Sequence, residues 1–262
     1  MKQKILSVLL LMAMCAALAA CSGGEKIYLN QDETKAMYTD INKYKGKYVE
    51  LVGKVFAEPE FDDKGVYFQM WGDPEKAERN TIVGFENPKL DLHEGDYVKV
   101  TGKIEKKFKG KNGFGAAIEA PQIKAENVEI LSYKDAVAPT TKEALPSVKT
   151  QEHYGYQVTV DKVEFSEKET RVYVKVVNNG AASFDLYSFN ALLIQNGTQY
   201  KEEGNYEADY PEVQTDLLPG LTTEGIFVFP KIEAADFKIV LDGMSDDYNE
   251  KIEDFIFDVP VQ

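Results

Sequence analysis

Histidine is the first side chain to consider for acid–base or metal chemistry, and the chain holds only His93 and His153. A histidine-rich zinc site or a Ser-His-Asp triad needs several such groups converging within one domain. These two fall in different halves of the chain, so we interpret both as surface residues. The sequence therefore predicts a protein that is not an enzyme and that needs no cofactor.

Carboxylates are abundant, and the densest acidic segment is residues 242–250, with Asp242, Asp246, Asp247 and Glu250. Calcium prefers several oxygen ligands from one loop, and this segment offers them. It lacks, however, the alternating Asp-x-Asp-x-Asp-Gly order of a calcium hand. We favour a solvated acidic loop without a metal, and keep a metal-dependent enzyme that uses acidic loops as an alternative.

Aromatic and lysine side chains form the strongest candidate binding surface. Tyr67, Gln69 and Trp71 alternate with apolar residues and are expected on the outward face of one strand. A second group is expected in the loop between the fourth and fifth strands: Lys106, Lys107, Phe108, Lys109, Lys111 and Phe114. Lysines attract anions, and aromatic rings stack on bases or sugars. The alternative is a solvated hairpin, with Trp71 capping one end of a barrel.

The elements that would position these residues follow a period of two. The expected strands are residues 49–55, 66–71, 81–85, 97–104 and an interrupted fifth strand over 116–118 and 128–131. Glycines inside the strands indicate a strongly bent sheet that closes on itself. Before the strands, a short amphipathic helix is expected to run from Asp32, as its N-cap, to about Tyr44.

Two segments of this first half share a pattern of glycine, lysine and valine. They are residues 44–55, YKGKYVELVGKV, and residues 94–104, EGDYVKVTGKI. In these segments the chain resembles OB-fold modules of the tRNA-anticodon type. The resemblance implies a five-stranded barrel over residues 38–133, in a fold that binds through its second and third strands and the flanking loops. It names no ligand, because one fold hosts many functions.

A second series of short strands occupies the rest of the chain. Asn178-Asn179-Gly180 and Asn196-Gly197 are turn signals, and Leu218-Pro219-Gly220 precedes an apolar run over 223–230. In these features the segment resembles an immunoglobulin-like accessory domain of unknown function found in Gram-positive lipoproteins. The resemblance implies a β-sandwich over residues 151–262 and a cell-surface setting, with no established activity.

The N-terminus has the three regions of a secretory signal: Lys2 and Lys4, an apolar run over 5–18, and small residues before Cys21. Residues 18–21, Leu-Ala-Ala-Cys, resemble the lipobox of bacterial lipoproteins. The resemblance implies that residues 1–20 are removed and that Cys21 is acylated as the mature N-terminus. Because Cys15 leaves with the signal, no free thiol would remain for redox or metal chemistry.

The predicted organisation is all-β: an OB-like five-stranded barrel followed by an immunoglobulin-like β-sandwich, after a cleaved lipoprotein signal peptide. Its parts are a signal peptide at 1–20, a lipidated N-terminus and tether at 21–37, the barrel at 38–133, a linker at 134–150 and the sandwich at 151–262.

The predicted function is non-catalytic: a binding or adaptor protein anchored by lipid to the extracytoplasmic face of the cell membrane. A Gram-positive cell is favoured by the family resemblance, and the outer membrane is the alternative in a double-membrane organism. The preferred partner is another envelope protein, and the alternative is an anionic glycan or wall polymer held by the lysine and aromatic residues. Nucleic acid ranks last, because the chain carries a net charge of −14.

Overall fold

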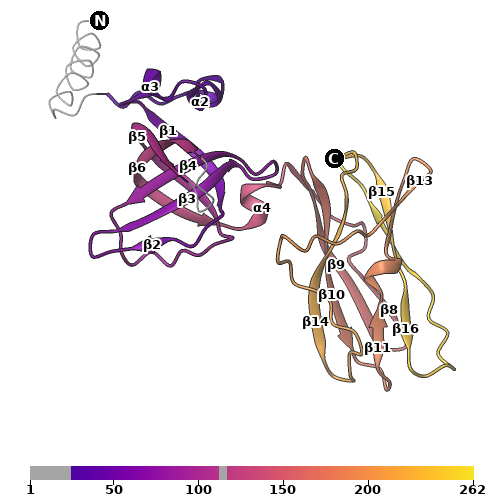
Figure 1. Ribbon diagram of the computed structural model, residues 1–262. Helices are drawn as coiled ribbons and strands as arrows, with labels where there is room; N and C mark the ends of the chain where they lie inside the picture. Colours follow the sequence, from indigo (N-terminus) through magenta and orange to yellow (C-terminus); the bar gives the residue numbers. More distant parts are fainter. Residues whose placement is uncertain (1–24, 112–116) are drawn as a thin grey trace, which may run out of the picture. The chain divides into compact units, whose positions relative to one another are not determined.

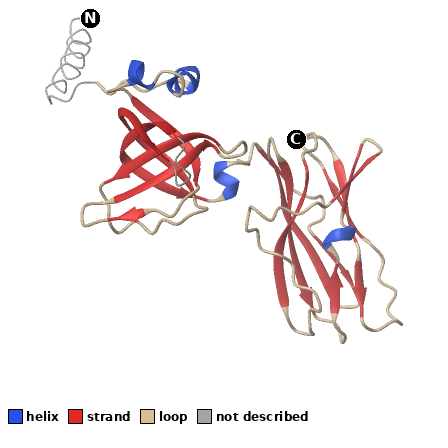
Figure 2. Ribbon diagram, viewed as in Figure 1, coloured by secondary structure: helices blue, strands red, loops and turns tan. Residues whose placement is uncertain are grey.

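The regular structure of the protein is mostly β-strand, as the sequence predicts (Figures 1 and 2). The computed structural model describes residues 25–111 and 117–262, so the predicted signal peptide and Cys21 lie outside the described residues. The helices are α2 (Gln31–Met37), α3 (Ile41–Tyr44), α4 (Tyr133–Ala136) and the short 3-10 helix η1 (Ser188–Asn190).

The strands fall into two series along the chain. The first series is β1 (Tyr48–Val55), β2 (Glu60–Phe61), β3 (Val66–Asp73), β4 (Glu78–Phe85), β5 (Tyr97–Lys111) and β6 (Ala117–Leu131). The second series is β7 (Lys142–Ala144), β8 (Thr150–His153), β9 (Tyr156–Phe165), β10 (Glu169–Asn178), β11 (Phe184–Leu186), β12 (Leu192–Gln195), β13 (Thr198–Lys201), β14 (Thr222–Pro230), β15 (Phe237–Leu241), β16 (Gly243–Ser245) and β17 (Phe255–Val259).

The chain divides into two compact units that do not follow the two strand series strictly. The first unit comprises Met1–Leu51, Pro59–Leu90 and Val100–Val128, and the second comprises Val52–Glu58, Asp91–Lys99 and Glu129–Gln262. Among the described residues, no helix is long and apolar enough to cross a membrane.

The N-terminal helix differs from the prediction of one helix starting at Asp32. Asn30 caps α2 instead. Its side chain accepts a hydrogen bond from the Glu33 backbone N–H, and the Glu33 side chain accepts one from the Asn30 backbone N–H. A second cap then interrupts the helix: the Asp40 side chain accepts from the Lys43 backbone and starts α3. The predicted segment is therefore two short helices separated by residues 38–40, of which Asp40 caps the second helix.

The first strand series forms one sheet that closes into a ring. Its strand order is β1-β5-β6-β4-β3-β2, and β1 also pairs with β3. The strands β4 and β6 run parallel, with Ile82 opposite Gln122. Gly102 permits the close approach of β5 and β6, because a Cβ atom there would lie 2.5 Å from the Lys124 carbonyl oxygen.

Several strands are longer than the sequence predicts. The strand β4 begins at Glu78, and β6 runs without interruption from Ala117 to Leu131. The strand β5 continues to Lys111, so Lys106, Lys107, Phe108, Lys109 and Lys111 belong to a strand. The prediction that these residues form a loop is wrong. The reason is that β5 and β6 extend as a long antiparallel pair beyond the alternating apolar residues that marked their ends.

The second strand series packs several sheets around one core. A sheet ordered β14-β10-β9-β7, with β8 also paired to β9, accompanies a sheet ordered β13-β12-β15-β17 and the pair β11-β16. Their buried side chains form one cluster, which includes Val158, Val174, Leu193, Phe229 and Phe257. The cluster joins residues far apart in sequence, as a core between packed sheets requires.

The segment 134–150, predicted as a linker, contains ordered elements. It holds most of α4 and all of β7, and Glu143 of β7 pairs with Glu164 of β9. Turn-forming prolines and threonines suggested a linker, but β7 is only three residues long and too short to show a period. These residues therefore contribute to the second sheet system.

Candidate functional site

The outward face of β3 carries three of the predicted binding residues. Val66, Phe68 and Met70 are buried, while Tyr67, Gln69 and Trp71 lie on the other side of the strand. Tyr67 is 44% exposed and stands opposite Gly84 of β4. The Tyr67 ring lies over Gly84, because a Cβ atom at that position would be 3.3 Å from the ring. The alternation thus brings these three residues to one accessible surface.

A pocket of about 220 Å³ lies beside Tyr67 on the ring-shaped sheet. Its walls come from β3, β4, β5, β6 and the residue after β4: Tyr67, Gly84, Phe85, Glu86, Glu105, Gln122, Ile123 and Lys124. Lys124 and Glu86 pair across it at 2.7 Å, and the hydrogen bond from Lys124 lowers the pKa of Glu86. The pocket therefore combines the Tyr67 ring with an exposed ion pair.

Polar groups continue this surface toward Trp71, which stands opposite Asn80 in the strand register. The Asn80 side-chain nitrogen donates to Gln69 Oε1 at 3.3 Å. Among the described residues, the Asn80 Oδ1 atom is buried without a hydrogen-bond partner. A buried acceptor without a partner is rare in folded proteins, and here it lies beside two of the predicted binding residues.

The lysine-rich part of β5 is partly neutralised by its neighbour strand. Lys107 and Lys109 both form ion pairs with Glu119 of β6, the second at 3.0 Å. Hydrogen bonds from these two lysines lower the pKa of Glu119, so this carboxylate is charged near neutral pH. Lys106 is exposed. Phe114 lies outside the described residues, as does the side chain of Lys111.

The predicted acidic segment 242–250 uses its carboxylates within the fold. Asp242 accepts from the Asn190 side chain at 2.6 Å, and Glu250 accepts from Tyr156 at 2.7 Å and from Ser245 at 2.6 Å. Within residues 25–111 and 117–262, no group of three or more acidic, histidine or cysteine side chains is placed to hold a metal ion. The geometry of this segment is that of hydrogen-bonded loop carboxylates.

The two histidines contact neighbouring side chains. His93 is exposed near Asp91, with its Nε2 atom 3.6 Å from that carboxylate, while its Nδ1 atom lies 3.9 Å from Asp96. His153 packs edge-on against Phe255, with 4.7 Å between the ring centres. Each histidine therefore has a local structural contact.

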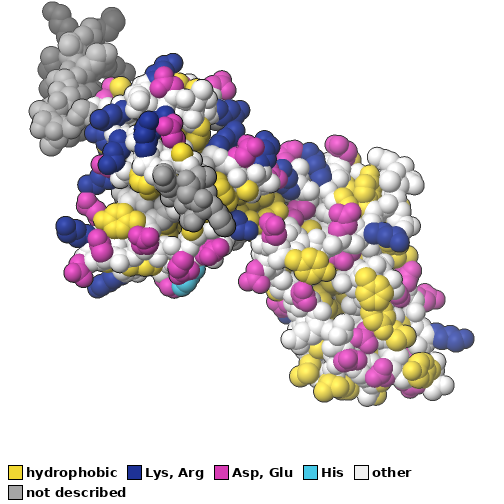
Figure 3. All heavy atoms as spheres, viewed as in Figure 1, with side chains coloured by type: hydrophobic (Ala, Val, Ile, Leu, Met, Phe, Trp, Pro, Cys, Tyr) yellow, Lys and Arg dark blue, Asp and Glu magenta, His cyan; other side chains and the backbone are white. Residues whose placement is uncertain are grey.

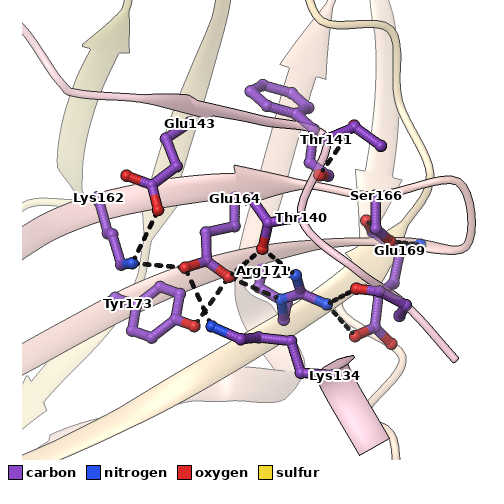
Figure 4. A network of polar contacts seen from close by, with 12 residues as sticks. Lys134, Thr140, Thr141, Glu143, Lys162, Glu164, Ser166, Glu169, Arg171 and Tyr173 are labelled. Carbon is purple, nitrogen blue, oxygen red and sulfur yellow. Dashed lines mark hydrogen bonds and ion pairs between the residues drawn. The ribbon is translucent and has the colours of Figure 1, made fainter. Parts of the chain in front are cut away.

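The strongest concentration of charge was missed by sequence reasoning and is buried in the second unit. Arg171 of β10 is 0% exposed and binds two carboxylates: Glu164 of β9 at 3.1 Å and Glu169 at 2.9 Å (Figure 4). Its guanidinium also donates to the Ala138 carbonyl and to Thr140 Oγ1, both at 2.8 Å. The arginine thereby ties the segment before β7 to the strands β9 and β10.

Further groups surround the carboxylates of this network. Glu164 also accepts from Thr140 at 2.9 Å and from Tyr173 at 3.0 Å, and it forms ion pairs with Lys162 and Lys134. Burial, followed by the hydrogen bond to Glu164, raises the pKa of Tyr173 to about 12. The network is fully hydrogen-bonded, as a buried group of charges must be to persist.

This network makes the stability of the second unit depend on pH. Burial alone would raise the pKa of Glu164, but hydrogen bonds from Lys162, Thr140 and Tyr173 outweigh it and hold the pKa at about 2. A carboxyl group with this pKa when folded and 4.5 when unfolded contributes about 3 kcal/mol above pH 4.5. That contribution is lost as the pH falls from 4.5 through about 2.

We expect a Glu164→Gln variant to lose the part of the acid sensitivity that Glu164 contributes. Urea unfolding followed from pH 6 to pH 2 measures it. The stability difference between wild type and variant should shrink as the pH falls, because both then carry a neutral side chain at this position. A difference that stays constant over this range would contradict the assignment of a depressed pKa to Glu164.

The sequence held one signal for this network. Arg171 and Glu164 stand opposite each other in the β9–β10 register, and both flank the short turn closed by Ser166. Paired charges beside a hairpin turn normally lie in solvent. Their burial arises from the segment 134–144, which covers them and which the sequence presents as a linker.

A second pocket lies against β14 in the same unit. Its volume is about 390 Å³, and the segment 202–213 forms most of its wall. This segment binds the edge of β14, because Glu203 donates its backbone N–H to Val228 at 2.9 Å and Ile226 donates to Pro211 at 2.8 Å. Burial raises the pKa of Glu202 in the pocket wall. The segment thus occupies a sheet edge that another strand would otherwise pair with.

The fold and surfaces define an all-β protein of two units with a candidate binding face. No protein-family model and no curated protein matches the chain. Among solved structures, a protein of unknown function from Listeria monocytogenes EGD-e is similar with a TM-score of 0.39 and 10% sequence identity. The match covers 50% of this chain and 94% of that one.

Proposed function

We propose that this is a non-catalytic, lipid-anchored binding protein of the cell envelope, which holds a protein partner on the outward face of β3. In this proposal the first strand series is an OB-type barrel, supported by its closed strand order and the parallel pairing of β4 with β6. The second series is an immunoglobulin-like sandwich, supported by two sheets that share one core.

The size and chemistry of the pocket beside Tyr67 carry the proposal. Its volume of about 220 Å³ is below the roughly 300–1,000 Å³ of sites for small molecules. A hollow of this size suits one large side chain of a partner protein. Partly exposed aromatic residues next to such hollows often supply much of the binding energy at protein interfaces. The Tyr67 ring would pack against the inserted side chain.

The alternative ligands have weaker support. A glycan or wall polymer with negative charge would meet Lys107 and Lys109, but both are already paired with Glu119. Nucleic acid would approach a chain of net charge −14, and such binding depends on neutralising phosphates with free basic residues. A protein partner makes no comparable demand on free positive charge.

A pull-down from detergent-solubilised envelopes tests this function. The bait is the mature chain after Cys21, residues 22–262, at low and high salt. We expect a protein partner that stays bound at high salt, since burial of apolar area is less sensitive to ions than charge pairing. In Tyr67→Ser, the affinity for that purified partner should fall at least about tenfold.

The matched control is Ile256→Ser, which changes an equally exposed apolar residue on β17 and should bind normally. A polyanion released by salt, and lost when Lys106, Lys107, Lys109 and Lys111 become alanine, would overturn the proposal in favour of polymer binding. Turnover of an envelope substrate that a single substitution abolishes would refute the non-catalytic role.

A further inference from the structure

Four exposed apolar side chains come from three separate segments of the second unit. Tyr154 is 55% exposed in the turn between β8 and β9, and Tyr248 is 87% exposed after β16. Leu218 and Leu221, before β14, are 58% and 50% exposed. We call these four residues the apolar loop end. Single exposed apolar residues are common, but a group of them at one place marks an interaction surface.

Hydrogen bonds place the turn with Tyr154 and the segment with Leu218 and Leu221 beside the connection between β10 and β11. Asn179 donates its backbone N–H to Gly155 at 2.9 Å, which places the turn with Tyr154 beside this connection. Asn178 donates to the Leu221 carbonyl at 3.0 Å, and Gly220 donates to the Asn178 carbonyl at 2.7 Å. Figure 1 shows these connections at the end of the second unit away from the C-terminus.

The third segment, with Tyr248, joins the same end. Asp246 donates its backbone N–H to the Ser183 carbonyl at 3.0 Å, and Tyr156 donates its hydroxyl to Glu250 at 2.7 Å. The backbone of all three segments is thus held in place before any partner binds. Pre-organised loops lose less conformational entropy on association, which favours their use as a docking surface.

The charges around the apolar loop end are mostly negative, and the exposed Lys251 directly follows Glu250. The segments 152–155, 178–183, 214–223 and 243–250 contain Glu152, Asp216, Asp246, Asp247 and Glu250, and they contain no lysine or arginine. Hydrogen bonds from the backbone and side chain of Asn249 lower the pKa of Asp247. Figure 3 shows hydrophobic and acidic side chains intermixed at this end.

This charge pattern selects among possible occupants. An anionic lipid surface would be repelled by the carboxylates, and a second copy of the chain would bring the same negative rim. A protein surface with apolar sockets between lysine and arginine side chains complements both features.

We propose that the apolar loop end docks a protein whose surface presents apolar sockets rimmed by lysine and arginine. This site belongs to the second unit and uses none of the residues of the β3 face. The protein would therefore have two binding surfaces, one on each unit, and an adaptor needs two.

Site-specific photo-crosslinking in the full-length chain tests the docking surface. A photoreactive residue replaces Tyr248 in one variant and Ile256 in a control variant, in cells that express the protein natively. We expect the Tyr248 position to capture one protein and the Ile256 position to miss it. The crosslinked peptide of the partner should lie within a lysine- and arginine-rich surface.

Binding of that purified partner then gives the quantitative readout. Leu218→Ser should weaken it at least about tenfold, because an apolar anchor is lost. The double variant Asp246→Asn, Asp247→Asn should weaken it at low salt and flatten its salt dependence. Tyr67→Ser should leave it unchanged, which separates this surface from the β3 face. Crosslinks only to lipid, only to another copy of this chain, or only at the control level would each overturn the proposal.

Discussion

Replacing Arg171 by methionine is expected to destabilise the second unit by about 3–5 kcal/mol, the range for removing one member of a buried ion pair. The substitution keeps a similar apolar volume but leaves Glu164 and Glu169 buried without their central cation. It also removes the donor to the Ala138 carbonyl, which helps to hold the segment before β7. The effect should therefore begin at residues 138–144 and include β9 and β10.

Hydrogen exchange of backbone amides measures this effect without assuming that both units unfold together. Protection in β7, β9 and β10 should fall in Arg171→Met. Protection in β3 and β4 should not change. The matched control is Lys238→Met, which breaks an exposed pair with Asp258 at 2.7 Å and should cost less than about 1 kcal/mol. Equal losses in both variants would show that the Arg171 network contributes no more than a surface pair.

A triple variant separates charge from packing in the same network. Arg171→Met combined with Glu164→Gln and Glu169→Gln removes the unpaired charges, so part of the lost stability should return. Without that recovery, the arginine would contribute mainly through the contacts of its side chain with the segment 138–140.

Local pattern was enough to predict the outward face of β3 but not the length of β5. Val66, Phe68 and Met70 alternate with polar or aromatic residues, so the sequence alone places Tyr67 on the outward face. The extension of β5 has no such apolar marker. Lys107 and Lys109 are held in the strand pair by Glu119, which is a contact between segments that propensity cannot show.

The buried network around Arg171 could be predicted even less from local sequence pattern. Arg171 follows the alternation of β10 as an outward residue, and in most sheets that position would face solvent. It is buried because Ala138 and Thr140 lie over it, and their segment has no period of its own. Burial of a charged residue thus depends on a distant part of the chain that no local window contains.

The lipid anchor leads to the prediction with the largest effect on where the protein resides. Cys21 lies outside the described residues, and the expectation rests on the resemblance of residues 18–21 to a lipobox. Each buried methylene contributes about 0.8 kcal/mol, so one acyl chain binds a bilayer reversibly and two or three bind it firmly. Cys21→Ser is therefore expected to abolish acylation, measured by incorporation of labelled fatty acid and by the intact mass of the N-terminal peptide.

Cys15→Ser is the matched control, because Cys15 belongs to the predicted signal and should leave acylation unchanged. A chain secreted from residue 22 onward, with an ordinary signal in place of residues 1–20, should move from the detergent phase to the aqueous phase on partition. An unmodified N-terminal peptide in the wild type would contradict the anchor. Without the lipid anchor, both proposed binding surfaces would have to find their partners by diffusion in three dimensions. The anchored chain instead meets envelope proteins on a shared membrane surface, where their local concentration is higher.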